Sequence, residues 1–265
     1  MAGISLTANP GSVGSNSREI SALCPGCLLV IGGAEDRTGD CALLRVFAQR
    51  SGGAGARITL ITTASGAPDA LFAQYSAAFR RYGVPDVCEQ RMSDRDDCDG
   101  ERALAGLARA TGVFFTGGDQ SRLGPLAGSR ANLLLRNRLT AGTLVVAGTS
   151  AGATALGQEM ILGDDAADQP RTGPGLGLLP EAVVDMHFTQ RRRLPRLVAA
   201  VRQRPSLLGI GIDEGTAILV RRGRFEVLGN GTVTTVEARG TRPDVRVRVS
   251  RAGGLFDLER RRPLS

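Results

Sequence analysis

Short runs of apolar and β-branched residues alternate with amphipathic stretches along the first two-thirds of this chain. The runs cover residues 27–31, 57–63, 113–115 and 144–147, and the stretch 69–82 has apolar residues at helical spacing. Strands without polar alternation have both faces buried, which is typical of parallel sheets. We therefore expect an α/β fold, with a doubly wound, mostly parallel sheet and helices on both of its faces.

The pattern changes after residue 205, where short strands are separated by turn signals such as Asn230-Gly231. This predicts a C-terminal β-hairpin section, and we expect the last fifteen residues to be frayed. Residues 1–23 are rich in serine, glycine and asparagine, which predicts a mobile N-terminal tail. No repeat or linker divides the remainder, so we expect residues 24–265 to form a single α/β domain.

Charge and hydropathy narrow the range of partners. The net charge is 33 − 26 = +7, but acidic residues are interleaved with the arginines and aromatic residues make up only 4%. The chain therefore lacks a stacking platform for nucleic acid, and we expect no nucleic-acid partner. No apolar run approaches the length of a membrane span and the first residues lack a signal peptide, which predicts a soluble, cytoplasmic protein without a membrane partner.

The five cysteines are an odd number without a dense framework, which fits a reducing compartment. Cys24 and Cys27 have the spacing of a redox or zinc pair. However, they lead into a strand, whereas a thioredoxin-like pair opens a helix, and the other cysteines supply no second pair of ligands. We expect neither function there.

The sequence Gly-Thr-Ser-Ala-Gly at 148–152 joins the apolar run 144–147 to a helical stretch. A strand, a sharp turn and a helix in this order hold a serine in a strained conformation with its hydroxyl exposed. The small residues let the chain bend and a substrate approach, and the first N–H groups of the helix point towards a developing oxyanion. A serine can also simply cap a helix, but this context favours Ser150 as a nucleophile.

A serine hydroxyl needs a base, and His187 is the only histidine in the sequence. It follows the run 183–186 and so lies at the carboxyl end of a predicted strand, where open α/β sheets bind their ligands. One histidine excludes a site with several histidine ligands, and no carboxylate spacing indicates another metal site. We therefore expect no metal and no cofactor.

The histidine in turn needs an acid that orients it. Asp185 is two residues away on the same strand and points parallel to His187 instead of towards it. Glu214 follows an apolar run that also ends in small residues, and alternation from Ile210 and Ile212 favours it over Asp213. Acidic residues elsewhere stay as alternatives, namely Asp164, Asp165 and Asp168.

Several segments, taken together, resemble the cyanophycinase family, serine peptidases of the class I glutamine amidotransferase-like fold that are related to aspartyl dipeptidase. The segments are residues 31–37, 114–123, 148–153, 185–197 and 209–217. The most specific one is the pattern Asp-x-His-Phe-x-x-Arg-x-Arg-x-x-Arg-Leu that begins at Asp185. The resemblance covers about residues 27–232 and makes the expected domain a peptidase domain.

The resemblance implies a triad of Ser150, His187 and Glu214, with backbone N–H groups near Gly118 and Ala151 as the oxyanion hole. It also implies a substrate cleft lined by Gln120, Asp185, Arg191, Arg193 and Arg196. The implied substrate is cyanophycin, a polyaspartate that carries arginine on its side chains, and the implied product is the β-Asp-Arg dipeptide. Arginine binds carboxylates in a bidentate manner, and Asp185, Glu35 or Asp36 would receive the guanidinium of the substrate.

Met186 departs from the family pattern, which has glutamine at this position, and the loss of a polar group bears on substrate identity. Two alternative functions follow. One is an α-aspartyl or isoaspartyl dipeptidase that acts on free dipeptides, and the other is an inactive binding module of the same fold. The resemblance also suggests a homodimer.

Overall fold

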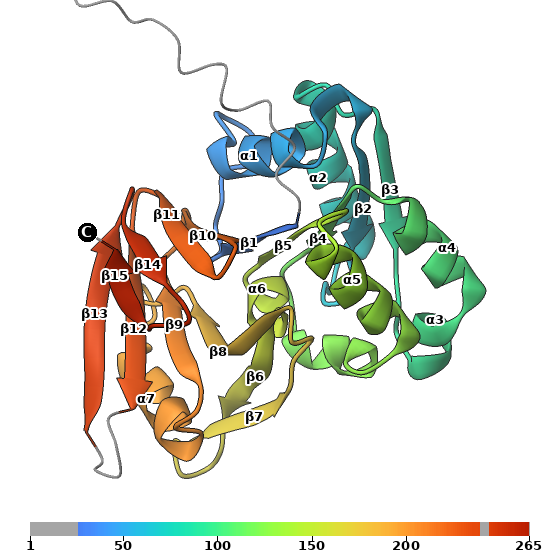
Figure 1. Ribbon diagram of the computed structural model, residues 1–265. Helices are drawn as coiled ribbons and strands as arrows, with labels where there is room; N and C mark the ends of the chain where they lie inside the picture. Colours follow the sequence, from blue (N-terminus) through green and yellow to red (C-terminus); the bar gives the residue numbers. More distant parts are fainter. Residues whose placement is uncertain (1–25, 239–243, 265) are drawn as a thin grey trace, which may run out of the picture.

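A computed structural model describes residues 26–238 and 244–264, and it contains two sheets (Figure 1). Within these residues one sheet has nine strands in the order β15-β14-β11-β10-β1-β5-β4-β2-β3, and the other has six in the order β13-β12-β9-β8-β6-β7. The expected N-terminal tail at 1–23 and the first cysteine of the Cys24 and Cys27 pair lie outside the described residues.

One half of the nine-stranded sheet is parallel. Its strands are β1 (Cys27–Ile31), β5 (Val145–Thr149), β4 (Gly112–Phe115), β2 (Arg57–Ile61) and β3 (Asp86–Gln90). The first of these has the bounds that its apolar run predicts. The strands β1, β5, β4 and β2 are almost wholly buried, as their apolar runs predict. The parallel pairing and this burial together confirm the expected α/β sheet.

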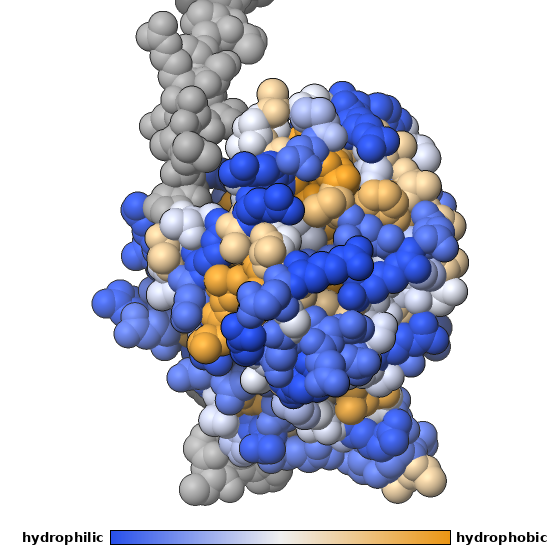
Figure 2. All heavy atoms as spheres, turned by 90° about the vertical axis from the view of Figure 1, so that its right-hand side faces the viewer, coloured by the Kyte–Doolittle hydropathy of each residue, from blue (hydrophilic) through white to orange (hydrophobic). Residues whose placement is uncertain are grey.

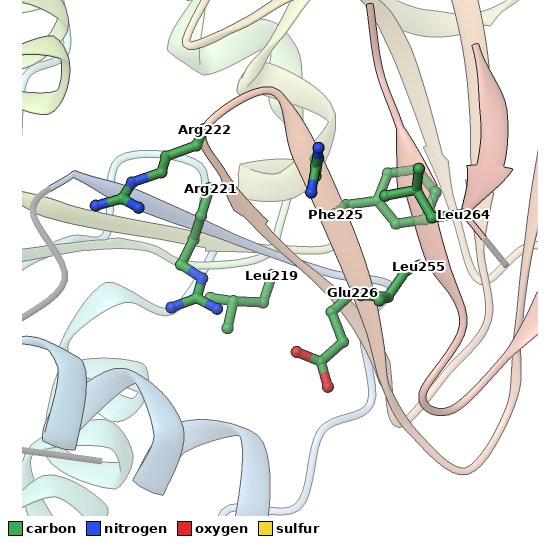
Figure 3. Close-up of a pocket in the computed structure, with 8 residues that line it drawn as sticks. Leu219, Arg221, Arg222, Phe225, Glu226, Leu255 and Leu264 are labelled. Carbon is green, nitrogen blue, oxygen red and sulfur yellow. The ribbon is translucent and has the colours of Figure 1, made fainter. Parts of the chain in front are cut away.

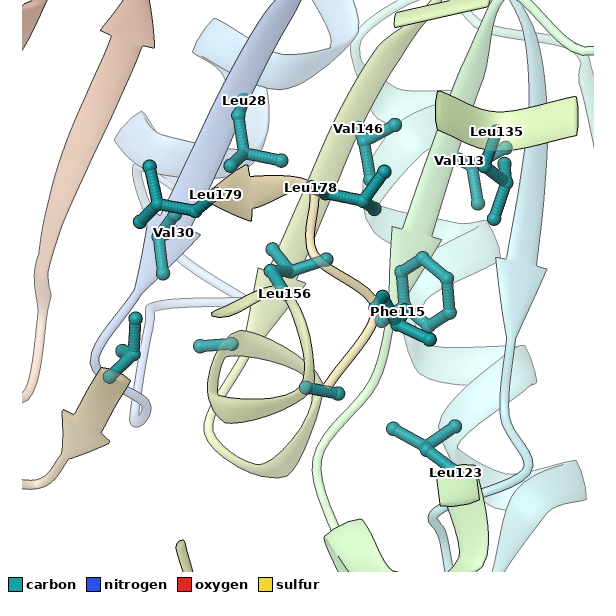
Figure 4. Packing of buried hydrophobic residues seen from close by; sticks show 14 of the residues in the cluster. Leu28, Val30, Val113, Phe115, Leu123, Leu135, Val146, Leu156, Leu178 and Leu179 are labelled. Atoms are coloured by element: carbon teal, nitrogen blue, oxygen red, sulfur yellow. The ribbon is translucent and has the colours of Figure 1, made fainter. Parts of the chain in front are cut away.

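Helices cover both faces of this half. On one face, α1 (Ala42–Arg50) and α2 (Pro68–Arg81) pack on a core that contains Phe47, Phe79 and Phe114. The other face carries α4 (Glu101–Arg109), α5 (Arg130–Thr140) and the short α6 (Ala151–Ala155), together with α3 (Arg95–Asp99). Figure 4 shows this second core, in which Val113 lies near Leu135 of α5. Two 3₁₀ turns, Gly53–Gly55 and Gln120–Leu126, complete this region.

The other half of the sheet is antiparallel and confirms the expected hairpin section. It contains β10 (Thr216–Arg221), β11 (Arg224–Gly229), β14 (Leu255–Asp257) and β15 (Arg262–Leu264). The expectation that the last fifteen residues fray is wrong for those described. Phe256 stacks on Phe225 with ring centroids 5.0 Å apart and is fully buried, so apolar burial holds this end of the chain.

The six-stranded sheet is made by the second half of the chain. Its strands are β6 (Gly157–Asp164), β7 (Pro170–Pro174), β8 (Leu179–Met186), β9 (Leu208–Ile212), β12 (Thr232–Ala238) and β13 (Val245–Arg251). The helix α7 (Leu194–Gln203) packs on it through Leu197 and Val201. The β8 and β9 strands are parallel and end side by side, which places the residues that follow them at one edge.

Figure 2 shows the face that carries β3, α3 and α4, on which hydrophilic residues predominate around smaller apolar patches. A cavity of about 550 Å³ lies on the antiparallel half, lined by residues that include Arg221, Glu226 and Leu255 (Figure 3). Arg221 is the last residue of β10, whereas Glu214 precedes the start of β10, so these two residues lie at opposite ends of the strand. In the described ranges, no helix is long and apolar enough to span a membrane.

Candidate active site

Ser150 occupies a strained turn between β5 and α6. Its backbone has φ 52° and ψ −116°, in the positive-φ range that residues other than glycine rarely adopt. The turn is tight, because a Cβ atom on Gly148 would lie 2.5 Å from the carbonyl oxygen of Gly152, and one on Gly152 would lie 2.4 Å from that of Phe115. The two glycines are therefore needed for the turn, and Ser150 itself is partly exposed.

His187 follows β8 directly and brings its ring to the serine. The distance between Ser150 Oγ and His187 Nε2 is 2.9 Å. The histidine is largely buried, and its backbone also has a positive φ of 50°. The nitrogen that faces the serine is thus in position to accept the hydroxyl proton.

Glu214 completes the chain of hydrogen bonds from the loop after β9. Its Oε1 lies 2.6 Å from Nδ1 of His187, and its side chain is 38% exposed. Asp213 cannot take this role, because its carboxylate accepts hydrogen bonds from the backbone N–H of Thr189 at 3.0 Å and of Thr232 at 2.9 Å. The geometry thus favours Glu214 over its neighbour.

The other candidate acids do not contact the imidazole of His187. Asp164 ends β6, and Asp165 caps the connection to β7 by accepting from the backbone N–H of Ala167 and Gln169. Asp168 lies in the same connection. Asp185 is two residues before His187 and, as the strand alternation predicts, does not point to the imidazole.

The end of β1 joins the three loops, a feature that the sequence analysis did not identify. The carbonyl oxygen of Ile31 accepts from the backbone N–H of Ser150 at 3.1 Å, and that of Gly32 accepts from His187 at 2.8 Å. The carbonyl oxygen of Gly33 accepts from Gly215, next to Glu214, at 2.9 Å. Two glycines at the end of a buried strand were the available signal, since glycine marks a close approach of another backbone.

The predicted oxyanion hole lies around the same turn. Ala151 is the first residue of α6, and the first N–H groups of a helix have no partner within it. The loop after β4 passes beside the serine, because a Cβ atom on Gly117 would be 3.3 Å from Ser150 Cβ. Gly118 has φ 143° and packs on the backbone of Ala64, which leaves no room for a side chain. The loop is therefore held against Ser150 by backbone packing.

The predicted binding residues divide into a cluster that pairs within itself, formed by Asp185, Arg193 and Arg196, and two residues outside that cluster, Gln120 and Arg191. Asp185 is only 1% exposed, and its oxygens accept from Arg196 Nε at 3.0 Å, Arg196 Nη2 at 2.5 Å and Arg193 Nη1 at 3.1 Å. It holds two arginines in place instead of presenting an open carboxylate. Gln120 donates to the carbonyl oxygen of Ile161 at 2.6 Å, and Arg191 is exposed beside a cavity of about 500 Å³.

Three further expectations concern single residues. Asp36 accepts from the backbone N–H groups of Gly39, Cys41 and Thr38, which lower its pKa to about 2, so this carboxylate shapes its own loop. Met186 is 4% exposed, with its sulfur against Arg193, so it faces the interior and not an open cleft. Cys27 is buried in β1.

Among the described residues, no group of three histidine, cysteine or acidic side chains could hold a metal ion.

The geometry is that of a serine hydrolase, and comparison with known proteins places the chain in a family. Residues 28–228 match peptidase family S51. The chain is 42% identical over 217 residues to a cyanophycinase of Trichormus variabilis, covering 79% of this chain and 73% of the relative. It is also 42% identical over 221 residues to a cyanophycinase of Synechococcus elongatus, covering 81% and 69%.

A solved structure has the same fold. The peptidase from an acI-B1 Actinobacterium superimposes with a TM-score of 0.68 at 21% identity and covers 88% of this chain and 97% of that one. The chain therefore belongs to peptidase family S51, and it is a serine-type peptidase.

Proposed function

We propose that this protein is a serine exopeptidase that hydrolyses cyanophycin to β-Asp-Arg dipeptides through an acyl-enzyme on Ser150. The observation that carries the proposal is the unbroken hydrogen-bond chain from Ser150 Oγ through His187 to Glu214, with steps of 2.9 and 2.6 Å. The relatives called cyanophycinase support the choice of substrate.

The reaction then proceeds as acyl transfer to water. Ser150 Oγ attacks an aspartyl peptide carbonyl while His187 Nε2 takes the hydroxyl proton, and Glu214 stabilises the imidazolium through Nδ1. The N–H groups near Gly118 and Ala151 hold the oxyanion. The imidazolium returns its proton to the leaving amine, and a water molecule repeats the sequence to release the acyl group and restore the serine.

The substrate contacts follow from charge. Each unit of the polymer carries one carboxylate and one guanidinium, so it needs both cationic and anionic partners. We assign the carboxylate to Arg191, with Gln120 at the edge of the cleft, because Arg191 is exposed four residues after His187. Asp185 contributes indirectly, by fixing the guanidinium groups of Arg193 and Arg196.

Two assays test this function. A serine-directed fluorophosphonate should label Ser150 in the wild type and leave Ser150→Ala unlabelled, whereas an unlabelled wild type would indicate an inactive binding module. Side-by-side assays of cyanophycin and of free aspartyl dipeptides should show turnover of the polymer. Turnover of the dipeptides alone would establish the dipeptidase alternative instead.

The remaining expectations stay predictions. They are a single domain, a homodimer, a cytoplasmic location and the absence of nucleic-acid and membrane partners.

A further inference from the structure

Glu35 is a buried carboxylate behind the nucleophile turn, and the proposed mechanism does not use it. The residue is 5% exposed. The hydroxyl of Tyr75 donates to one carboxylate oxygen, and the hydroxyl of Thr149 donates to the other at 2.5 Å. Thr149 is the last residue of β5 and directly precedes Ser150. One of the two partners of Glu35 therefore belongs to the backbone that carries the nucleophile.

The sequence explains why these groups meet. Side chains alternate along β5, so Val145, Ala147 and Thr149 face the core that α1 and α2 cover. Tyr75 of α2 lies in the same core, and Glu35 enters it from the loop after β1. Ser150 then leaves the strand with its positive φ and turns its hydroxyl to the other side, towards His187.

The energetics indicate that this network has a purpose beyond packing. Burying a carboxylate is costly unless both oxygens are hydrogen-bonded, and an apolar residue could fill the same space. Arg37 lies over the ring of Tyr75 at 5.4 Å from its centroid, close to the buried charge. Burial and the charge of Glu35 raise the pKa of Tyr75, so its hydroxyl stays a donor.

A strained residue keeps its conformation only where its surroundings over-determine it. On one side, the N–H of Ser150 is fixed by the carbonyl oxygen of Ile31 at 3.1 Å. On the other side, the side chain of Thr149 is fixed by Glu35 at 2.5 Å. Loss of the second contact removes one of the constraints that keep the Ser150 hydroxyl facing His187.

We infer that Glu35 is a positioning residue, which acts through the Thr149 hydroxyl to hold Ser150 in line with His187. The inference rests on the proposed function, in which Ser150 is the nucleophile. It concerns the rate of the chemical step and not substrate affinity, because neither Glu35 nor Thr149 faces solvent.

The first experiment compares Thr149→Val with a matched control. Thr149→Val keeps shape and removes the donor, and the control Thr59→Val makes the same change at another buried strand threonine, whose hydroxyl lies 3.4 Å from Cys88 Sγ. We expect Thr149→Val to lower kcat on cyanophycin about 10- to 100-fold with little change in KM. Thr59→Val should keep kcat within about twofold, and Thr149→Ser should restore most of the activity.

A double-mutant cycle tests the route through Thr149. If Glu35 acts through that hydroxyl, Glu35→Gln should lower kcat in the wild type but have little further effect in Thr149→Val. Additive losses would overturn the inference, because they would mean that Glu35 and Thr149 act independently.

Labelling separates failure of the inference from failure of the proposed function. The rate at which a fluorophosphonate modifies Ser150 does not depend on which peptide is the substrate. A slower labelling rate in Thr149→Val than in Thr59→Val supports the inference. If the wild type is labelled and the two variants are labelled at equal rates, the inference is overturned and the proposed function stands. A wild type that is not labelled overturns the proposed function and the inference with it.

Discussion

Gly33 lies against the imidazole ring of His187, without room for any side chain between them. A Cβ atom on Gly33 would be 2.4 Å from Cε1 and 2.6 Å from Nε2 of the ring, and its backbone has φ 104°. Real Cβ atoms do not come this close to other heavy atoms, so any larger residue at position 33 must displace the imidazole ring of His187. The nitrogen that would move is the one that faces Ser150 Oγ.

Gly33→Ala should therefore lower kcat by about 100-fold or more, since a misplacement of about 1 Å costs that much. The assay is hydrolysis of cyanophycin, with circular dichroism to show that the variant is folded. Gly55→Ala is the control, because a Cβ atom there meets nothing within 4 Å. A Gly33→Ala enzyme as active as this control would contradict the assigned position of the ring.

Asp185→Asn should destabilise the fold strongly. Its removal leaves the guanidinium groups of Arg193 and Arg196 without their buried anion, which costs about 3–5 kcal/mol in comparable pairs. Urea denaturation measures the loss. Glu101→Gln breaks a surface pair with Arg130, whose side chains are 84% and 60% exposed, and should cost less than about 1 kcal/mol. Similar losses in the two variants would show that Asp185 is not a structural anchor.

The acid stability of the protein should depend on Asp213. Burial alone would raise the pKa of Asp213, but hydrogen bonds from Thr232 and Thr189 outweigh it and hold the pKa below the ordinary value. Because the pKa is lowered in the folded state, the contribution is fully present above about pH 4, the unfolded value. It is lost as the pH falls through the folded pKa.

The corresponding measurement is the free energy of unfolding of wild type and Asp213→Asn from about pH 7 down to about pH 3. The difference between them should be largest above about pH 4 and shrink below it. Asp86→Asn, at the exposed start of β3, serves as control. A difference that stays constant with pH would show that the charge of Asp213 does not contribute.

Arg191→Ala should raise KM about tenfold with a small change in kcat, because a charge-assisted hydrogen bond contributes at least about 1.5 kcal/mol. Unlike Arg193 and Arg196, Arg191 makes no side-chain ion pair within the described part of the chain. Steady-state kinetics on cyanophycin would check this, with Arg109→Ala at the exposed end of α4 as control. Unchanged KM would remove Arg191 from the cleft.

Much of the fold follows from the sequence because a strand buried on both faces carries its own apolar pattern, as in Cys27–Ile31. The pattern records burial and not the pairing partner, so the separate six-stranded sheet was not predicted. Its strand Pro170–Pro174 contains two prolines and a glycine, which are typical of loops, and it lies at the sheet edge, where proline is tolerated.

The site was predictable to the extent that its chemistry left few choices. Because the sequence has one histidine, His187 was the candidate base, and the turn at Ser150 made that serine the candidate nucleophile. The role of Asp185 as an anchor was not predictable, because its arginine partners come from the next helix start, where they could equally face solvent. Glu35 was expected only as a possible partner of the substrate guanidinium, whereas it is 5% exposed and both of its oxygens are occupied. Its contacts with Tyr75 and Thr149 were not predicted, since these residues lie 40 and 114 positions away in the chain.

The central claim is that Ser150 is the nucleophile of a peptidase that acts on cyanophycin. The most direct test incubates purified wild type and Ser150→Ala with cyanophycin granules and follows the soluble products by mass spectrometry. We expect release of β-Asp-Arg by the wild type and none by Ser150→Ala. Release of the dipeptide by Ser150→Ala at the wild-type rate would contradict the central claim.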